Sequence, residues 1–198
     1  MPGAELCSRL VASGGTRRTL VQGASSRAGY GGSAGVRMAI DVRGYRDADG
    51  LSAVRTCLIE LQEFERGLDP RVPTGEAIAD LYLEGLFQRC GECAGELFVV
   101  EAGGQVVGFV SVLGTCRSDA PDDSPEPFAY VDDLVVLPQY RGRGYGRALL
   151  RRAETYAAAH GRSTVRLRVK GGNHSARGFY ARAGYTEYEV ELEKKVGG

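Results

Sequence analysis

This sequence lacks several features that define particular classes of protein. It has no tryptophan and two histidines, and its 25 lysines and arginines balance its 25 aspartates and glutamates. A net charge of zero excludes a globally basic nucleic-acid binder and a long acidic tail. No apolar run approaches the about 20 residues that a membrane helix needs, and no repeat indicates a solenoid or a coiled coil. The 198 residues, 43% of them hydrophobic, therefore fit about one globular domain.

Cysteine is present, but it forms no pattern that defines a site. The five cysteines are an odd number in a chain too long for a small disulfide scaffold, which favours a reducing compartment and a cytoplasmic location. Cys90 and Cys93 form one C-x-x-C pair, whereas a zinc site needs further ligands, and His160 and His174 lie in other predicted elements. We expect no metal site and interpret these thiols as incidental, with redox chemistry as the alternative.

The first 37 residues differ in composition from the rest. They are rich in Gly, Ser, Ala and Arg, and Glu5 is the only acidic residue before Asp41. Such a segment cannot bury enough apolar surface to offset the entropy of ordering it. We therefore expect a disordered tail over 1–37 and one domain over 38–198, with Met38 as an alternative start. A transit peptide fits the arginines and serines but not the poor amphipathic pattern, and a secretory signal lacks its apolar core.

Regular structure is predicted from Ile40 onward. The periodicity and the turn residues predict, in order, a strand over 40–43, a helix from Asp47 or Asp49 to the break at Asp69, a helix from Thr74 to Gly91 or Gly95, strands over 96–101, 106–112 and 128–137, a helix over 144–160, a strand over 164–169, a helix over 175–181 and a strand over 185–192. The order β-α-α-β-β-β-α-β-α-β predicts a single α+β domain whose mixed central sheet is flanked by helices.

A glycine-rich turn between a predicted strand and a predicted helix carries the strongest chemical signal. Glycines alternate at Gly142, Gly144 and Gly146, and no acidic residue lies between Gln139 and Arg152. Glycines let the backbone approach a ligand closely, and the N–H groups that start a helix favour an anion. The turn lacks the P-loop string, and the third glycine of a dinucleotide-binding fingerprint is missing. The turn therefore suits a pyrophosphate or another polyphosphate held by neither of these standard loops. The alternative is that it only caps a helix among solvated arginines.

Two blocks carry a resemblance to a known family. Arg141-Gly142-Arg143-Gly144-Tyr145-Gly146 resembles the Gln/Arg-x-x-Gly-x-Gly/Ala signature of the GNAT superfamily of acetyl-CoA-dependent N-acetyltransferases. The run from Asn173 to Tyr185 resembles the family's Asn-x-x-Ala-x-x-Phe-Tyr-x-x-x-Gly-Phe/Tyr block. The blocks stand in family order, and the predicted elements from Ile40 to Leu192 match as well, so the resemblance covers about four fifths of the chain.

The resemblance implies transfer of an acetyl group from acetyl-CoA to a primary amine of a small molecule or peptide by direct attack. Another acyl-CoA as donor, or a non-catalytic acyl-CoA-binding module, are the alternatives. Relatives of this kind are often homodimers. The backbone that would hold the coenzyme A pyrophosphate comprises Arg141, Gly142, Arg143, Gly144, Tyr145, Gly146 and Arg147. The strand edge that would pair with the pantetheine arm comprises Leu134, Val135 and Val136, and Asn173 would bond the same arm.

The resemblance also implies which residues act on the reacting atoms. An amine must lose a proton to attack a thioester, and Asp132 is the proposed acceptor of that proton, with Asp133 as the alternative. Strand alternation puts these two carboxylates on opposite faces of the sheet, and a purely structural role is possible for either. Tyr180 is the proposed acid for the departing thiolate, and a strand N–H near Val135 would hold the oxyanion.

Three further features have a functional and an ordinary interpretation. Cys116 could carry an acetyl group, but no paired histidine is evident, so direct transfer is preferred. The acidic loop from Asp119 to Glu126 would attract a cationic amine or is simply solvated. A basic face would be formed by Arg147, Arg151, Arg152, Arg162, Arg166 and Arg168, although the zero net charge makes nucleic acid a poor candidate partner.

Overall fold

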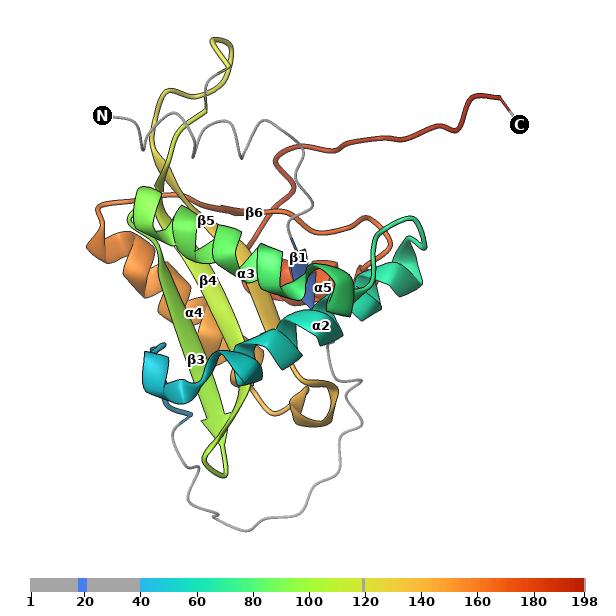
Figure 1. Ribbon diagram of the computed structural model, residues 1–198. Coiled ribbons are helices and arrows are strands. Elements are labelled where there is room, and N and C mark those ends of the chain that lie inside the picture. Colours follow the sequence, from blue (N-terminus) through green and yellow to red (C-terminus); the bar gives the residue numbers. More distant parts are fainter. Residues whose placement is uncertain (1–17, 21–39, 119, 198) are drawn as a thin grey trace, which may run out of the picture.

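The computed structural model describes residues 18–20, 40–118 and 120–197, and it shows one sheet between two layers of helices (Figure 1). The strands are β1 (Arg18–Leu20), β2 (Val42–Gly44), β3 (Glu96–Ala102), β4 (Gln105–Cys116), β5 (Phe128–Val136) and β6 (Val165–Leu167). The helices are α2 (Leu51–Leu68), α3 (Gly75–Glu92), α4 (Tyr145–Ala159) and α5 (His174–Arg182), with short 3-10 turns η1 (Asp47–Asp49) and η2 (Pro138–Tyr140). From β2 to α5 this is the order that the sequence predicts.

The sheet is mixed, and β5 is its central member. The described strands run β1-β5-β4-β3-β2, and β6 also pairs with β5. Strands β2 to β5 pair antiparallel, whereas β1 and β6 both run parallel to β5. Every residue of β5 is buried, which is why Phe128–Val136 reads as a nearly continuous apolar run.

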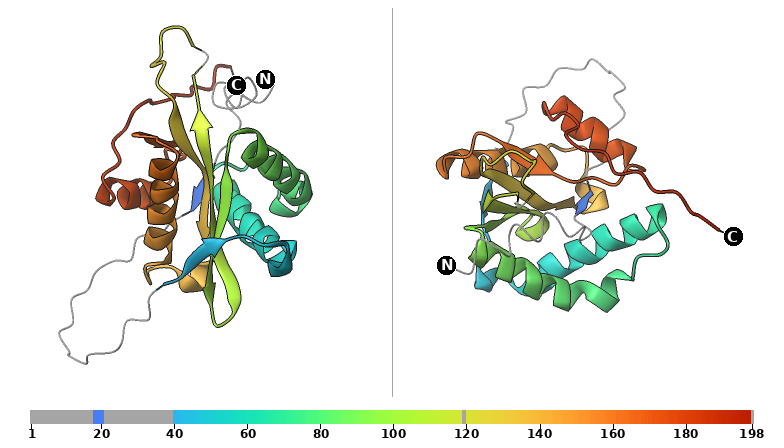
Figure 2. Two further views of the ribbon diagram at one scale, coloured as in Figure 1. Left: turned by 90° about the vertical axis from the view of Figure 1, so that its left-hand side faces the viewer. Right: turned by 90° about the horizontal axis from the view of Figure 1, so that it is seen from above.

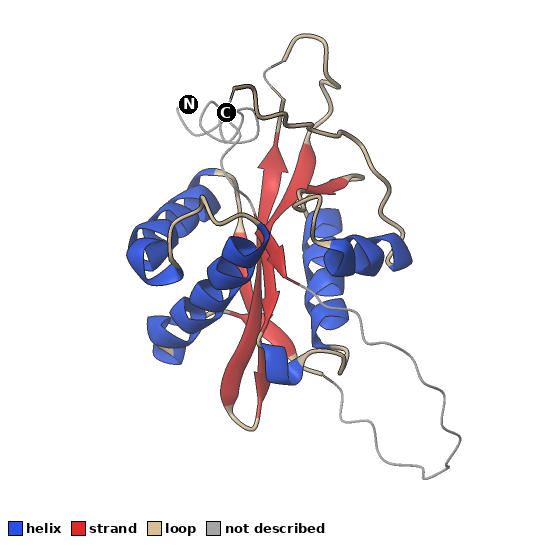
Figure 3. Cartoon of the chain, turned by 90° about the vertical axis from the view of Figure 1, so that its right-hand side faces the viewer, coloured by secondary structure: helices blue, strands red, loops and turns tan. Residues whose placement is uncertain are grey.

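The helices cover both faces of the sheet. Helices α2 and α3 lie on one face, and α4 and α5 lie on the other (Figures 2 and 3). Helix α2 buries Val54, Cys57, Leu58 and Leu61, which recur at helical spacing and form one stripe against the sheet. Helix α3 begins where the Thr74 side chain accepts a hydrogen bond from the N–H of Ala77, as its sequence predicts.

None of the helices in the described ranges is both long enough and apolar enough to cross a bilayer. Residues 1–17 and 21–37 of the predicted tail lie outside the described residues. Within that tail, Arg18–Leu20 form the strand β1 rather than disordered chain. The composition of the tail gives no indication of this edge strand.

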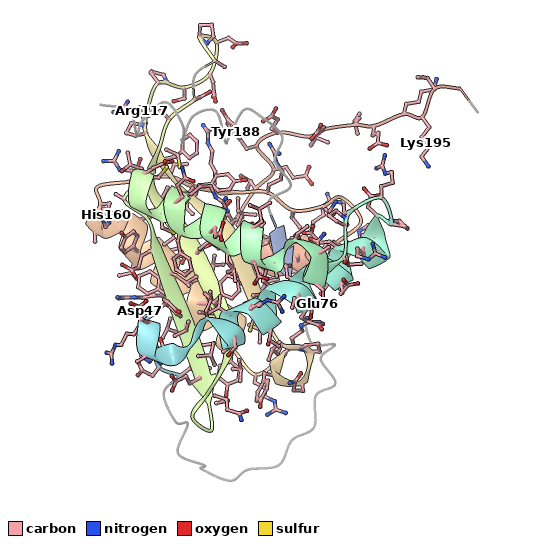
Figure 4. The ribbon with its side chains drawn as sticks, in the orientation of Figure 1. Asp47, Glu76, Arg117, His160, Tyr188 and Lys195 are labelled. Atoms are coloured by element: carbon pink, nitrogen blue, oxygen red, sulfur yellow. The ribbon has the colours of Figure 1, made fainter. Side chains whose placement is uncertain are left out.

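The predicted strand over 185–192 is wrong. These residues are described, but they form no strand, and Tyr188, Val190 and Leu192 are well exposed. Alternating apolar residues form a strand only where a neighbouring edge supplies hydrogen bonds. Here side-chain contacts hold the segment instead, because the Tyr188 hydroxyl donates to Asp123 and the Arg166 guanidinium lies 4.1 Å from the centre of the Tyr188 ring. Figure 4 shows Tyr188 close to the sheet and Lys195 far from it on the extended C-terminal segment.

Candidate functional site

The glycine turn lies where β5 ends and α4 begins. Gly142 and Gly144 have φ angles of +74° and +94°, and Gly144 is the residue that precedes the first turn of α4. A side chain at Gly144 would be strained, and its Cβ would lie 3.2 Å from Cδ1 of Ile40. Because this N-cap residue is a glycine, it has no side chain to cap the first N–H groups of α4, which is the arrangement that favours a phosphate.

The arginines of the turn have different roles. Arg141 points inward, and its Nε donates to the carbonyl oxygen of Val136 at 2.8 Å, while its terminal nitrogen lies 3.5 Å from Glu60. Burial lowers the pKa of Arg141, opposed by the nearby Glu60 carboxylate. Arg143 and Arg147 are exposed, and the Arg143 guanidinium lies 5.7 Å from the centre of the Tyr140 ring. Arg141 therefore fixes the turn, whereas Arg143 and Arg147 supply positive charge at the surface.

The outer edge of β5 is shared by two parallel strands. Strand β6 pairs with Ala129–Val131, and β1 pairs with Asp133–Val135. Leu134 and Val135, which the sequence assigns to a pantetheine arm, thus lie opposite Thr19 and Leu20. Val136 follows, with its carbonyl oxygen bonded to Arg141. Leu134, Val135 and Val136 are thus buried, and β1 pairs with the edge that the sequence assigns to the pantetheine arm.

The two aspartates of β5 do not lie on opposite faces, and that prediction is wrong. Ser111 of β4 pairs with Asp133 while Val112 pairs with Val131, so Asp132 is an extra residue that bulges out of the register. A bulge breaks the alternation of side chains. Val131 and Leu134 both pack on the α4 and α5 face, and both carboxylates face α3 instead.

On that face the aspartates are held by a buried polar network. Nε of Arg89 donates to Oδ2 of Asp132 at 2.8 Å. The Tyr82 hydroxyl donates to Oδ1 of Asp133 at 2.8 Å, and Oγ of Ser111 lies 3.1 Å from Oδ2 of Asp133. Burial lowers the pKa of Arg89, but the charges of Asp132, Tyr82 and Asp133 outweigh it, so the pKa stays above its ordinary value.

The sequence reasoning did not identify Arg89, Tyr82 and Ser111. A signal was available, because two carboxylates in an apolar strand require a buried cation or hydroxyl nearby. Tyr82 and Arg89 are seven residues apart on α3 and so lie on one face of that helix. The Arg89 guanidinium lies 5.3 Å from the centre of the Tyr82 ring, which joins the two contacts into one cluster.

The other predicted residues lie on the opposite face of the sheet. Asn173 is buried and precedes α5, where its Oδ1 accepts a hydrogen bond from the N–H of Ala176 at 3.0 Å. Tyr180 is buried among the side chains that pack between the sheet and the α4 and α5 layer. Its ring lies 5.1 Å from that of Phe179 and 5.5 Å from that of Tyr185. Tyr180 and Asp132 thus approach the edge of β5 from different faces.

The other functional interpretations of the sequence involve residues in other parts of the fold. Burial raises the pKa of the Cys90 thiol to about 12, and Cys93 and Cys116 are buried in an apolar cluster. Among the residues that the structure describes, no group of three or more His, Cys, Asp or Glu side chains could hold a metal ion. Arg166, part of the predicted basic face, lies against the Phe128 ring and 3.3 Å from Asp123 of the acidic loop.

Comparison with known proteins identifies the family. The model of the acetyltransferase (GNAT) family matches residues 60–185, well over half of the chain. An uncharacterized N-acetyltransferase of Methanocaldococcus jannaschii is 35% identical over 125 residues, which are 63% of this chain and 53% of the relative. The chain spans somewhat more than half the length of the first curated relatives it matches.

Solved structures show the same fold. A putative acetyl transferase from Pyrococcus furiosus has a TM-score of 0.61 and 22% identity, and the match covers 79% of this chain and all of that one. The enzyme AAC(6')-Iy, solved with a bisubstrate analogue that contains CoA, has a TM-score of 0.58 and 19% identity over 81% of this chain and all of that one. The chain belongs to the GNAT family of acetyltransferases, which use acetyl-CoA as the acetyl donor.

Proposed function

We propose that this protein transfers an acetyl group from acetyl-CoA to a primary amine of a small molecule or peptide. The observation that carries the proposal is the turn at Gly142 and Gly144, which opens α4 directly beside the outer edge of β5. The turn offers N–H groups to the pyrophosphate. The edge at Leu134 and Val135, which pairs with β1 in this structure, would offer its backbone groups to the pantetheine amides once β1 leaves it. The cytoplasmic location and the homodimer stay predictions.

Direct attack is favoured over a covalent acetyl-enzyme. In the transfer, the neutral amine attacks the thioester carbon, the C–S bond breaks, and the coenzyme leaves as a thiolate that takes up a proton. Cys116, the alternative carrier, pairs with Phe128 at the far end of β5 from the glycine turn, and it is buried. A buried thiol at that place cannot exchange acetyl groups with a coenzyme whose pyrophosphate lies at the turn.

Two side chains are proposed to move the protons. Both oxygens of Asp133 are engaged, by Tyr82 and Ser111, which fits a structural role. Asp132 is the proposed acceptor of the amine proton, through water, with Arg89 orienting its carboxylate. Tyr180 is the proposed donor to the thiolate, and the N–H of Val135 or a neighbour is the proposed oxyanion donor.

Binding of acetyl-CoA tests the proposal first. Calorimetric titration of the purified chain with acetyl-CoA, and then with free coenzyme A, should show one site for each. We expect Gly144→Ala to weaken binding by about tenfold, because the turn can relieve the about 1–2 kcal/mol that an alanine costs at this φ only by leaving the geometry proposed to hold the pyrophosphate. An amine panel with the saturated protein would then identify the acceptor.

A matched control separates the turn from general strain. Gly161, at the other end of α4, also has a positive φ, and nothing lies within 4 Å of an added Cβ. Gly161→Ala should lose a similar amount of stability but keep its acetyl-CoA affinity. Equal affinity in both variants would contradict the assignment of the turn. Binding of a longer acyl-CoA in preference, or binding without turnover of any amine, would favour the two alternatives instead.

Replacement of Asp132 tests the proposed base. Asp132→Asn should lower kcat by about 10²-fold and flatten the pH–rate profile, because general-base catalysis contributes about 10²–10⁴. Asp133→Asn should disturb the contacts with Tyr82 and Ser111 and lower the melting temperature, yet keep the shape of the profile. A wild-type profile for Asp132→Asn with an altered one for Asp133→Asn would transfer the role to Asp133.

A further inference from the structure

Strand β1 lies on the part of the β5 edge that the proposed function assigns to the coenzyme. Arg18, Thr19 and Leu20 pair in parallel with Asp133, Leu134 and Val135. These three residues come from a segment that precedes the domain, and β1 is found in Figure 1 as the short blue strand beside β5 and near α2. The remaining strands form a complete sheet from β2 to β6 without it.

Most of the backbone groups on the outer edge of β5 already have partners. Strand β6 takes Ala129–Val131, β1 takes Asp133–Val135, and the carbonyl oxygen of Val136 accepts the bond from Arg141. Neighbouring strands lie about 4.8 Å apart, so a second chain or an extended ligand cannot pair with the same residues at the same time. Whatever binds Leu134 and Val135 next must displace β1.

We propose that the N-terminal segment at Arg18–Leu20 is an internal competitor for the acyl-CoA site. In the free protein it adds a strand to β5, and the pantetheine arm of the coenzyme replaces it when the coenzyme binds. This inference rests on the proposed function, since that function assigns the edge at Leu134 and Val135 to the coenzyme. The N-terminal segment would thus regulate coenzyme binding by adding a strand to the edge of β5.

The size of β1 fits a displaceable occupant. It has three residues and one pairing partner in the sheet, whereas β4 has twelve residues and partners on both sides. A short edge strand contributes little, so a ligand that makes further contacts at the glycine turn can replace it. If the segment occupies the edge in about 70–90% of free molecules, the apparent Kd for acetyl-CoA rises by about 3- to 10-fold.

Hydrogen exchange tests the displacement directly on the full chain. Of the amides of Thr19 and Leu20, the one that faces β5 should show protection in the free protein and lose it when saturating acetyl-CoA is added. Amides of β3, which does not border the site, should stay protected in both states. Protection at residues 18–20 that persists in the saturated protein would overturn the inference, because β1 and the coenzyme would then occupy different places.

Proline substitution tests the competition. Thr19→Pro with Leu20→Pro removes two consecutive backbone N–H groups, one of which faces β5 whichever way the strand is turned. Acetyl-CoA should bind this variant about 3- to 10-fold more tightly than the wild type. The same two changes at Ser25 and Ser26, outside β1, form the matched control and should leave the Kd unchanged.

A peptide added in trans completes the design. A synthetic peptide with the sequence of residues 14–24 should bind the proline variant and raise its apparent Kd for acetyl-CoA, whereas a scrambled peptide should not. Equal Kd values for the wild type and the proline variant, with coenzyme binding intact, would overturn the inference and leave the proposed function standing. No acetyl-CoA binding by any of the folded variants would overturn both.

Discussion

Tyr180→Phe should lower kcat by about 10²-fold or more and leave the Kd for acetyl-CoA within about twofold of the wild type. The change removes one oxygen from a ring that is buried between the sheet and the α4 and α5 layer. The shape of the core is kept, and so are the ring contacts with Phe179 and Tyr185. Because the leaving thiolate needs a proton, loss of a positioned phenol should slow C–S cleavage without weakening the binding of the coenzyme. Pre-steady-state turnover together with calorimetry would separate the two effects.

Tyr185→Phe is the matched control. It removes a hydroxyl from the ring packed against Tyr180, and burial with the nearby Glu154 carboxylate raises the pKa of that hydroxyl. Tyr185 has no proposed role at the thioester, so kcat should stay within a few-fold. If Tyr180→Phe turns over as fast as Tyr185→Phe, solvent rather than Tyr180 protonates the thiolate.

Most of the fold could be predicted because its signals are local. Helix α3 has a capping threonine at its start, the β3–β4 hairpin has Gly103 and Gly104 at its turn, and β5 is a continuous apolar run. The glycine turn before α4 could be predicted in the same way, since the positive φ angles at Gly142 and Gly144 favour glycine there. Family membership, which rests on two such local blocks, followed from the same stretches.

The errors come from pairing between distant segments. The alternation of Tyr188, Val190 and Leu192 predicts a strand, yet no edge receives it. The composition of the first 37 residues predicts disorder, yet Thr19 pairs with Leu134. In each case strand formation depends on whether a segment far away in the sequence offers a free edge. No short window of residues therefore predicts it.

The bulge at Asp132 shows the same limit within one strand. Alternation assigns Asp132 and Asp133 to opposite faces, and the shift in register between Ser111 and Val112 of the neighbouring strand cancels that assignment. The cation that compensates the two carboxylates is then Arg89 of α3, which is 43 residues away from Asp132 in the sequence. The register of the sheet, as well as the residue types, therefore decides which side chains meet at such a site.

Arg89→Met should destabilise the fold by about 3 kcal/mol or more, because it leaves the Asp132 carboxylate buried without its cation. The Asp132 side chain is 1% exposed and that of Arg89 is 14% exposed, so water compensates little of the loss. In a domain of this length, such a loss lowers the melting temperature by about 6–12 °C. Thermal unfolding of the variant beside the wild type measures the loss.

Two further variants show whether the buried charge is the cause. Arg89→Met with Asp132→Leu removes both charges and should recover much of the stability, since an apolar pair can replace a buried ion pair. Arg55→Met removes a partly exposed arginine that bridges α2 to the exposed Glu76 and Asp80 of α3, and it should change the melting temperature little. If the double variant is as unstable as Arg89→Met, lost packing of the long arginine stem on the Tyr82 ring explains the effect, and the ion pair does not. Recovery of stability in the double variant would show that the charge of Asp132 is what Arg89 of α3 compensates.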